Sequence, residues 1–191
     1  PTHRQLKQRA NMPFIGLSKP KQQAVSERLN IGDTVPDGLA SHEQFSLVVF
    51  LRHTGCPFAE AMLKDLSELA DEHSELHCVA ICHGEADVAQ AWLNKFELSP
   101  ELNIYIDEER RLYGEWGVGY SNIFHLANPK MVMSLVSLLP QGIYNRDASG
   151  TRWQTHASFL VAPDQTVQWA HFPSHAGEFP DLHDAANAVW D

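Results

Sequence analysis

The sequence VVFLRHTGCPFAEAMLKDLSEL, residues 48–69, predicts a buried strand that runs directly into an amphipathic helix. The apolar run over 47–51 is rich in β-forming residues, as in a central strand that is covered on both faces. Pro57 suits the first turn of a helix, where its missing N–H has no helical partner. Beyond Pro57, apolar residues recur at helical spacing as far as Leu69, and charged residues such as Glu60 and Lys64 fill the other face. Cys56 is therefore expected in the turn between the strand and the helix.

A cysteine in such a turn has a chemical advantage. The first N–H groups of a helix have no intrahelical partners and carry the positive end of the helix dipole, and both stabilise a thiolate. The thiolate is the nucleophilic form, which attacks a peroxide, a disulfide or an electrophilic carbon. The alternative is a buried structural cysteine, since free cysteines are often found in protein cores. We predict the nucleophilic role for Cys56.

Composition and charge argue against several classes of protein. The chain has 191 residues and a formal net charge of −10 at pH 7, and no cluster of Lys and Arg stands out. This balance disfavours a nucleic-acid-binding or anionic-membrane surface. Three cysteines (Cys56, Cys78 and Cys82) are too few and too closely grouped for a secreted disulfide framework. No apolar run approaches the ~20 residues of a membrane span, and residues 1–16 have no signal-peptide core. We expect a cytoplasmic protein with neither nucleic acid nor membrane as its partner.

Further apolar runs predict the rest of one α/β domain. Strands are expected over 75–82, 103–107 and 157–161, and a tight turn joins the last of these to a strand over 166–172. Helical patterns follow the second and third strands and end the chain, over 88–96 after a turn at 83–87, over 108–116 and over 179–190. Val88, Trp92, Leu93 and Phe96 form the expected apolar face of the first of these helices. The order of elements is that of a thioredoxin-like fold, with a central mixed β-sheet flanked by helices.

Two segments lie outside this core. Residues 1–30 are polar with scattered apolar positions and are interpreted as an N-terminal extension, in which 21–29 favours a short helix. The thioredoxin-like domain is expected over 31–191. Residues 121–146 are interpreted as an insertion in it, and 129–138 has the composition of a helix. The insertion is expected either to cover the pocket or to form a dimer contact.

The ordered set of motifs resembles that of the peroxiredoxin-like proteins of the alkyl hydroperoxide reductase / thiol-specific antioxidant (AhpC/TSA) superfamily. The resemblance covers roughly residues 31–190 and implies a thioredoxin-like fold and, for many members, thiol-based redox activity. It is carried by Gly32-Asp33 with Pro36-Asp37, FLRHTGCPFAEAML (50–63), VAICHGEADVAQAWL (79–93), IYIDEERRLYGEWGVG (104–119) and RWQTHASFLVAPDQTVQWAHFPSHAGEFPD (152–181).

The chain also departs from the pattern of these relatives. Members often have C-P-x-C at the turn, whereas Ala59 stands here at the second cysteine position, so a C-x-x-C exchange cycle is excluded. True peroxiredoxins have Thr or Ser three residues before the nucleophile and Pro seven residues before it, where this chain has His53 and Val49. Relatives commonly have Gly-Gly before the strand opposite the active cysteine, where this chain has His156-Ala157. The resemblance therefore implies a thiol site with altered neighbours.

Three residues of the turn and one distant histidine are candidates for assisting Cys56. Arg52 would hold the thiolate or an anionic group of the substrate, and Thr54 would donate a hydrogen bond to a peroxide oxygen. His53 is expected to line the substrate site. If the fold is as predicted, His156 lies near Cys56 and acts as its general base or thiolate partner. The simpler alternatives are a solvated charge for Arg52 and a structural, hydrogen-bonded residue for His156.

Further polar residues are predicted near the same pocket. Arg152 and Trp153 are expected to line it. Cys82 ends a strand, and the carboxyl ends of strands face the ligand crevice in open α/β sheets. Cys82 would then resolve a sulfenic acid on Cys56 as a disulfide, whereas the alternative makes Cys78 and Cys82 ordinary core residues. The 11 histidines form no H-E-x-x-H signature and the cysteines no paired C-x-x-C, so neither a metal nor a cofactor is predicted.

These observations favour a thiol-dependent, antioxidant-type oxidoreductase in which Cys56 reacts with a hydroperoxide or with a small thiol or electrophile. The expected partners are a small-molecule substrate and an external thiol reductant, and a homodimer is an open alternative. Two other hypotheses keep the fold. One is an enzyme that performs acid–base or covalent chemistry on a small organic metabolite with Cys56 and His156, and the other is a non-catalytic binding module.

Overall fold

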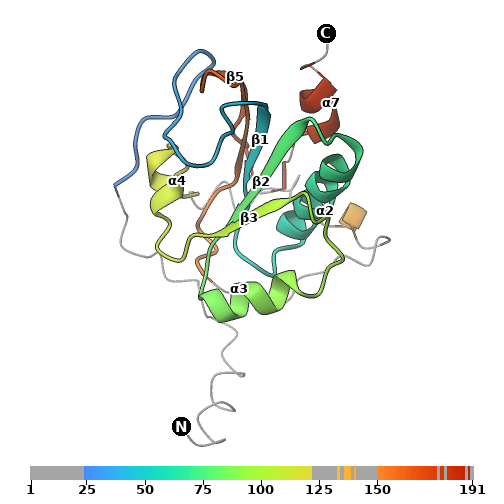
Figure 1. Cartoon of the computed structure of the whole chain (residues 1–191). Coiled ribbons are helices and arrows are strands. Elements are labelled where there is room, and N and C mark those ends of the chain that lie inside the picture. Colours follow the sequence, from blue (N-terminus) through green and yellow to red (C-terminus); the bar gives the residue numbers. More distant parts are fainter. Residues whose placement is uncertain are drawn as a thin grey trace, which may run out of the picture.

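One five-stranded sheet organises the protein. The computed structural model describes residues 24–121, 133, 136–138, 140, 150–175, 177–178, 180–187 and 189. In chain order, the elements within them are β1 (Phe45–Phe50), α2 (Pro57–Glu72), β2 (Leu76–Cys82), α3 (Ala86–Leu93), β3 (Asn103–Ile106), α4 (Arg111–Glu115), β4 (Ala157–Val161), β5 (Val167–His171) and α7 (Leu182–Asn187). Helices α2 and α7 lie on one side of the sheet and α4 lies on the other (Figure 1).

The sheet is mixed and has β1 at its centre. The strand order is β3-β2-β1-β4-β5, in which β1, β2 and β3 are parallel. Strand β4 runs antiparallel to β1, and β5 runs antiparallel to β4. Val49 in β1 lies opposite Ala80 on one side and Ser158 on the other. This arrangement confirms the predicted thioredoxin-like fold, and each strand lies within a few residues of its predicted range.

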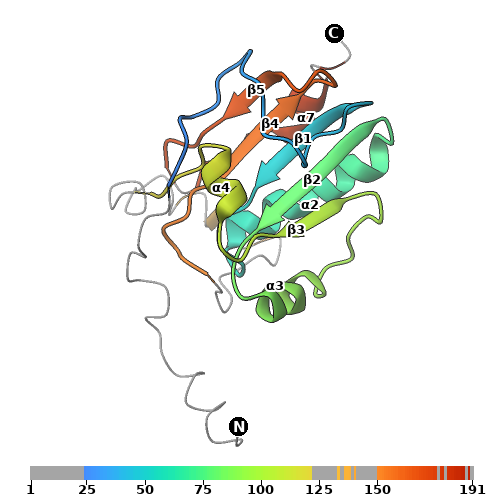
Figure 2. The same ribbon diagram turned by 60° about the vertical axis from the view of Figure 1, so that its left-hand side comes forward.

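Both faces of β1 are buried, as its continuous apolar sequence predicts. Leu47 and Val49 belong to the core that the sheet shares with α2, α3 and α7. Val48 and Phe50 point to the opposite face, where they pack with residues of and around α4. The two layers of helix on opposite faces are visible in Figure 2. Alternation along one strand therefore supplies side chains to two separate hydrophobic cores.

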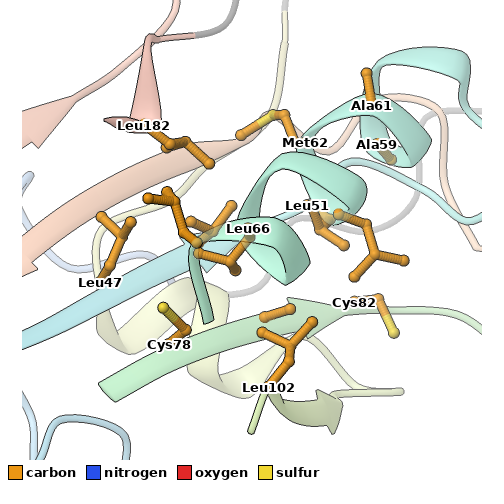
Figure 3. Packing of buried hydrophobic residues seen from close by; sticks show 14 of the residues in the cluster. Leu47, Leu51, Ala59, Ala61, Met62, Leu66, Cys78, Cys82, Leu102 and Leu182 are labelled. Atoms are coloured by element: carbon orange, nitrogen blue, oxygen red, sulfur yellow. The ribbon is translucent and has the colours of Figure 1, made fainter. Parts of the chain in front are cut away.

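Helix α2 is held against the sheet by its apolar face. Met62 and Leu66 are both essentially fully buried, and Leu182 of α7 packs over the same cluster. Figure 3 shows these side chains above Cys78 and Cys82 of β2. This packing fixes the start of α2, and therefore Cys56, relative to the ends of β1 and β2.

Two helices start later than the sequence predicts. Helix α4 was expected from 108, but Asp107 accepts hydrogen bonds from the backbone N–H groups of Arg111 and Leu112 at 3.0 and 2.8 Å. The residues between form a turn, in which Arg110 is left-handed with φ 60°. Helix α7 begins at Leu182 rather than 179.

Three other details differ from the sequence prediction. Val88 is 40% exposed, so it does not belong to the apolar face of α3, whereas Trp92 and Leu93 are buried. Residues 24–29 form no helix. Glu60 is 2% exposed in the first turn of α2, where it accepts a hydrogen bond from Lys64 at 2.9 Å.

Much of the predicted insertion, 121–146, lies outside the described residues, as do residues 1–23. Within the insertion, Met133 and residues 136–138 are helical. In the described ranges, no helix is both long enough and apolar enough to cross a membrane.

A buried tyrosine ties together the strand ends that carry the site. The Tyr113 hydroxyl of α4 lies 2.6 Å from the carbonyl oxygen of Leu51 and 2.9 Å from that of Ile81. Its ring packs edge-on against Phe50 at a centroid distance of 5.0 Å. The carboxyl ends of β1 and β2 are therefore held side by side, directly before the turns that follow them.

Candidate active site at the start of α2

The predicted thiol turn is formed. Cys56 is the N-cap residue of α2, with an extended backbone (φ −76°, ψ 129°), and Pro57 occupies the start of the helix. Gly55 has φ 81°, in the left-handed region that favours glycine. The Cys56 N–H donates to the His53 carbonyl at 3.2 Å, and its own carbonyl accepts the Glu60 N–H at 3.0 Å. Cys56 is 3% exposed, so its thiol sits at the helix N-terminus under nearly complete cover.

Arg52 contacts the thiol directly. Its Nη1 donates to Cys56 Sγ at 3.4 Å, and its Nη2 donates to the Arg152 carbonyl oxygen at 3.1 Å. Arg52 is 6% exposed, so this charge acts through little water. Among the described residues, Arg52 is the hydrogen-bond partner of the sulfur. The Arg52 guanidinium and the start of α2 therefore meet at the same cysteine.

Two buried histidines near the turn are uncharged. Burial, with the Arg52 charge nearby, lowers the pKa of His53 to about 3. Burial also lowers the pKa of His83 to about 3, with His53 as the next contribution. His53 Nδ1 lies 3.0 Å from the Thr54 carbonyl, so the neutral ring donates from Nδ1 and leaves Nε2 as an acceptor. Neither imidazole supplies positive charge to the site at neutral pH.

The segment before β4 lies beside the thiol turn. The bond from Arg52 to the Arg152 carbonyl joins the two segments, and both Arg152 and Trp153 are half-buried. In the thiol turn itself, the predicted site residue Thr54 is fully buried. Gln154 anchors the segment, because its Nε2 donates to the Gly119 carbonyl at 2.9 Å. The structure thus brings the predicted pocket residue Arg152 to the Cys56 turn from 100 residues away.

His156 lies at the same edge of the sheet. It precedes Ala157, which pairs with Phe50 at the end of β1. The His156 ring is fully buried, its Nε2 lies 2.5 Å from the Glu178 carbonyl oxygen, and it stacks on His171 at 6.4 Å. Among the described residues the hydrogen bond of the Cys56 sulfur is with Arg52 instead. The role of His156 as a base for Cys56 stays a prediction.

The other two cysteines lie in the core. Cys78 and Cys82 are both fully buried on the face of β2 that packs against α2 (Figure 3). Burial raises the pKa of each thiol to about 12. All three cysteines are free. This environment fits the alternative of ordinary core residues and gives the resolving role of Cys82 no support.

The histidines do not assemble into a ligand set. His83 packs edge-on against Tyr113 at 5.4 Å, whereas His156 and His171 stack on each other near Glu178. In the described part of the chain, no group of three or more His, Cys, Asp or Glu residues is placed to hold a metal ion.

Sequence reasoning missed two residues near the site, His83 and Tyr113. A signal for His83 was present, because it directly follows β2 as Arg52 follows the end of β1. The carboxyl ends of neighbouring parallel strands meet at one edge of a sheet. Tyr113 had no such signal, since its two carbonyl partners belong to different strands.

Several solved structures are similar to this chain in fold. A peroxiredoxin-like protein from Aquifex aeolicus superposes with a TM-score of 0.58 at 13% identity, over 88% of this chain and 91% of that chain. AhpC from Mycobacterium tuberculosis gives 0.52 at 14% identity, over 86% and 94%. A thiol peroxidase from Chromobacterium violaceum gives 0.51 at 13% identity, over 91% and 93%. At these identities the similarity establishes the fold alone, and the protein belongs to the class of thioredoxin-like folds.

The family follows from the sequence. Residues 62–175 match the AhpC/TSA antioxidant enzyme family, which is more than half of the chain, and the protein belongs to that family. The resemblance to this superfamily is thereby confirmed. Family and fold together support a peroxiredoxin-like or thiol–disulfide oxidoreductase. The matched segment begins just after Cys56, so the geometry of the thiol turn is a separate observation. No curated protein matches the chain.

Proposed function

We propose that the protein is a thiol peroxidase that uses Cys56 as its single nucleophile and draws its electrons from an external thiol. The observation that carries this proposal is the 3.4 Å contact between Arg52 Nη1 and Cys56 Sγ at the N-cap of a 16-residue helix. The guanidinium thus donates a hydrogen bond to the sulfur that would attack the peroxide, at the first turn of the helix. Membership of the AhpC/TSA family supports a redox use of that thiolate.

The reaction proceeds in two stages. The Cys56 thiolate attacks the terminal peroxide oxygen, so that an S–O bond forms as the O–O bond breaks. Two electrons leave sulfur, and the departing oxygen takes a proton to become an alcohol or water. The resulting sulfenic acid condenses with an external thiol to a mixed disulfide and water. A second thiol then attacks the mixed disulfide, which releases Cys56 and an external disulfide.

An external thiol is required by the surroundings of Cys56. Ala59 occupies the position of a local resolving cysteine, so no C-x-x-C disulfide forms. Cys78 and Cys82 are fully buried, and burial raises the pKa of each to about 12, which makes both poor nucleophiles. A small thiol that reaches Cys56 would supply the missing sulfur.

The test is peroxide consumption with a thiol donor. We expect wild-type protein to consume hydrogen peroxide or an organic hydroperoxide and Cys56→Ser to lose this activity. Cys78→Ala is the matched control, because it removes a buried thiol that the reaction does not use. Peroxide turnover by Cys56→Ser at the wild-type rate would exclude the proposal. Arg52→Met should slow the first stage and Arg52→Lys should slow it less, since lysine keeps the charge but not the fork of donors.

A second candidate is acid–base or covalent chemistry on a small organic metabolite by Cys56 and His156. It is favoured by the full burial of His156 at the sheet edge that carries the Cys56 turn. In the acid–base form of this candidate, in which His156 carries the reaction, activity on a metabolite survives in Cys56→Ser and is lost in His156→Ala. The peroxidase instead loses peroxide turnover in Cys56→Ser, so these variants separate the two.

A further inference from the structure

Two arginines lie beside the Cys56 turn, Arg52 buried and Arg152 half-buried. Arg52 is 6% exposed and its Nη2 donates to the Arg152 carbonyl at 3.1 Å. The Nε atoms of both arginines are buried, and within the described residues neither has a hydrogen-bond partner. Both guanidinium charges lower the pKa of His53, so both lie within electrostatic range of this neighbour of Cys56. The site therefore holds two cations with unused donors.

These charges have no carboxylate counterpart in the described part of the chain. The ion pairs formed there involve other cations. Glu60, one turn into α2, is already paired with Lys64 at 2.9 Å. A buried charge without a partner is unfavourable, and a thiolate formed at Cys56 in the proposed reaction would balance Arg52 alone. Within the described residues, the second positive charge has no paired carboxylate.

We propose that Arg52 and Arg152 form a carboxylate-binding site, so that the organic molecule that reacts at Cys56 carries a carboxylate group. Guanidinium donors match the geometry of a carboxylate, and pairs formed away from water are stronger than pairs on the surface. Arg152 is half-buried, so it offers the more accessible side of the site, while Arg52 reaches the sulfur. This inference rests on Cys56 being the nucleophile of the proposed function, but not on a peroxidase cycle.

Two alkylating probes of nearly equal size test the charge preference. Iodoacetate is an anion and iodoacetamide is neutral, and each reacts when the thiolate forms a C–S bond and iodide leaves. The rate with iodoacetate is divided by the rate with iodoacetamide at Cys56, and this ratio is then divided by the same ratio for a free cysteine derivative. The result reports the electrostatic potential at the Cys56 sulfur. We expect a normalised preference for iodoacetate of about tenfold or more, which corresponds to about 1.4 kcal/mol. A normalised ratio near one overturns the proposal, whatever the peroxidase assay gives.

Variants assign the preference to the second arginine. Arg152→Gln should bring the normalised ratio towards one, and Arg152→Lys should retain most of it. Arg111→Gln is the matched control, because Arg111 is 77% exposed in α4 and should leave the ratio unchanged. Circular dichroism verifies that each variant is folded. A preference that survives Arg152→Gln in folded protein contradicts the proposal.

Two further pairs identify which reactant brings the carboxylate. A fatty-acid hydroperoxide is compared with its methyl ester, and 3-mercaptopropionate is compared with its amide. A preference for the acid within the first pair assigns the site to the oxidant, and one within the second pair assigns it to the reductant. Equal rates within both pairs of a protein that turns over would overturn the carboxylate assignment. Absence of turnover with every peroxide, together with an iodoacetate preference, would instead refute the peroxidase proposal alone.

Discussion

Replacing Cys82 should leave the reaction at Cys56 intact. Cys82 ends β2, where its Cα pairs with Ile106 and its carbonyl accepts the Asp107 N–H at 2.8 Å. Its side chain is fully buried in the core beneath α2. Burial raises the pKa of the Cys82 thiol from 9.0 to about 12. We therefore expect Cys82→Ala to keep the wild-type rate of peroxide turnover with an external thiol.

The size of the effect follows from the thiolate fraction. Each pKa unit changes this fraction about tenfold at a pH below both values, so a rise from 9.0 to about 12 lowers it about a thousandfold. External thiol at millimolar concentration should therefore reach a Cys56 sulfenic acid well before Cys82 does.

The assay combines turnover with mass mapping of disulfides. Protein treated with one equivalent of hydrogen peroxide should contain Cys56 sulfenic acid and no Cys56–Cys82 peptide pair. Cys78→Ala is the matched control, since Cys78 lies on the same face of the same strand with a thiol pKa also raised to about 12. Both variants leave a cavity of the same kind, so a loss of turnover in Cys82→Ala alone would refute the reasoning. A Cys56–Cys82 disulfide in the wild-type protein would refute it as well.

Three further predictions concern stability. Folded His53 and His83 each have a pKa of about 3 against an ordinary 6.5, so unfolded chains bind more protons between these values. The free energy of unfolding should then fall as pH drops from 6.5 towards 3, by up to about 1.4 kcal/mol per pH unit per histidine. Urea unfolding of His53→Asn at a series of pH values should show a weaker dependence of this free energy on pH than the wild-type protein does. Tyr113→Phe removes the hydroxyl contact with the Leu51 carbonyl and should cost about 1–2 kcal/mol in urea unfolding, whereas an unchanged midpoint would contradict that role. Gly150→Ala should lower the melting temperature through a loss of about 1–3 kcal/mol, because φ is +82° and its Cβ would lie 2.4 Å from His83 Nδ1; an unchanged melting temperature would contradict this.

The fold was predictable where local pattern and burial agree. The apolar run of β1 predicted a central strand, and its residues do alternate between two cores. Hydrophobic periodicity gave the wrong burial where a residue forms an ion pair or lies at the periphery of the core. Glu60 is buried because Lys64 pairs with it, although its charge suggested the outer face. Val88 is exposed because the short helix α3 packs through Ala89, Trp92 and Leu93.

The site likewise contains contacts that the sequence predicts, between residues close in the chain, and contacts that it does not, between residues far apart. Arg52 and Cys56 are four residues apart in one turn, so their contact follows from the local chain once Gly55 allows the bend. Arg152 reaches the same turn through a bond that spans 100 residues, which no sequence spacing encodes. Its backbone carbonyl, not its side chain, makes that bond, and the guanidinium keeps its donors for another partner. The thiol motif predicts a nucleophile but not its substrate. The charge of the distant Arg152 instead favours a negatively charged group on the molecule that reacts with Cys56.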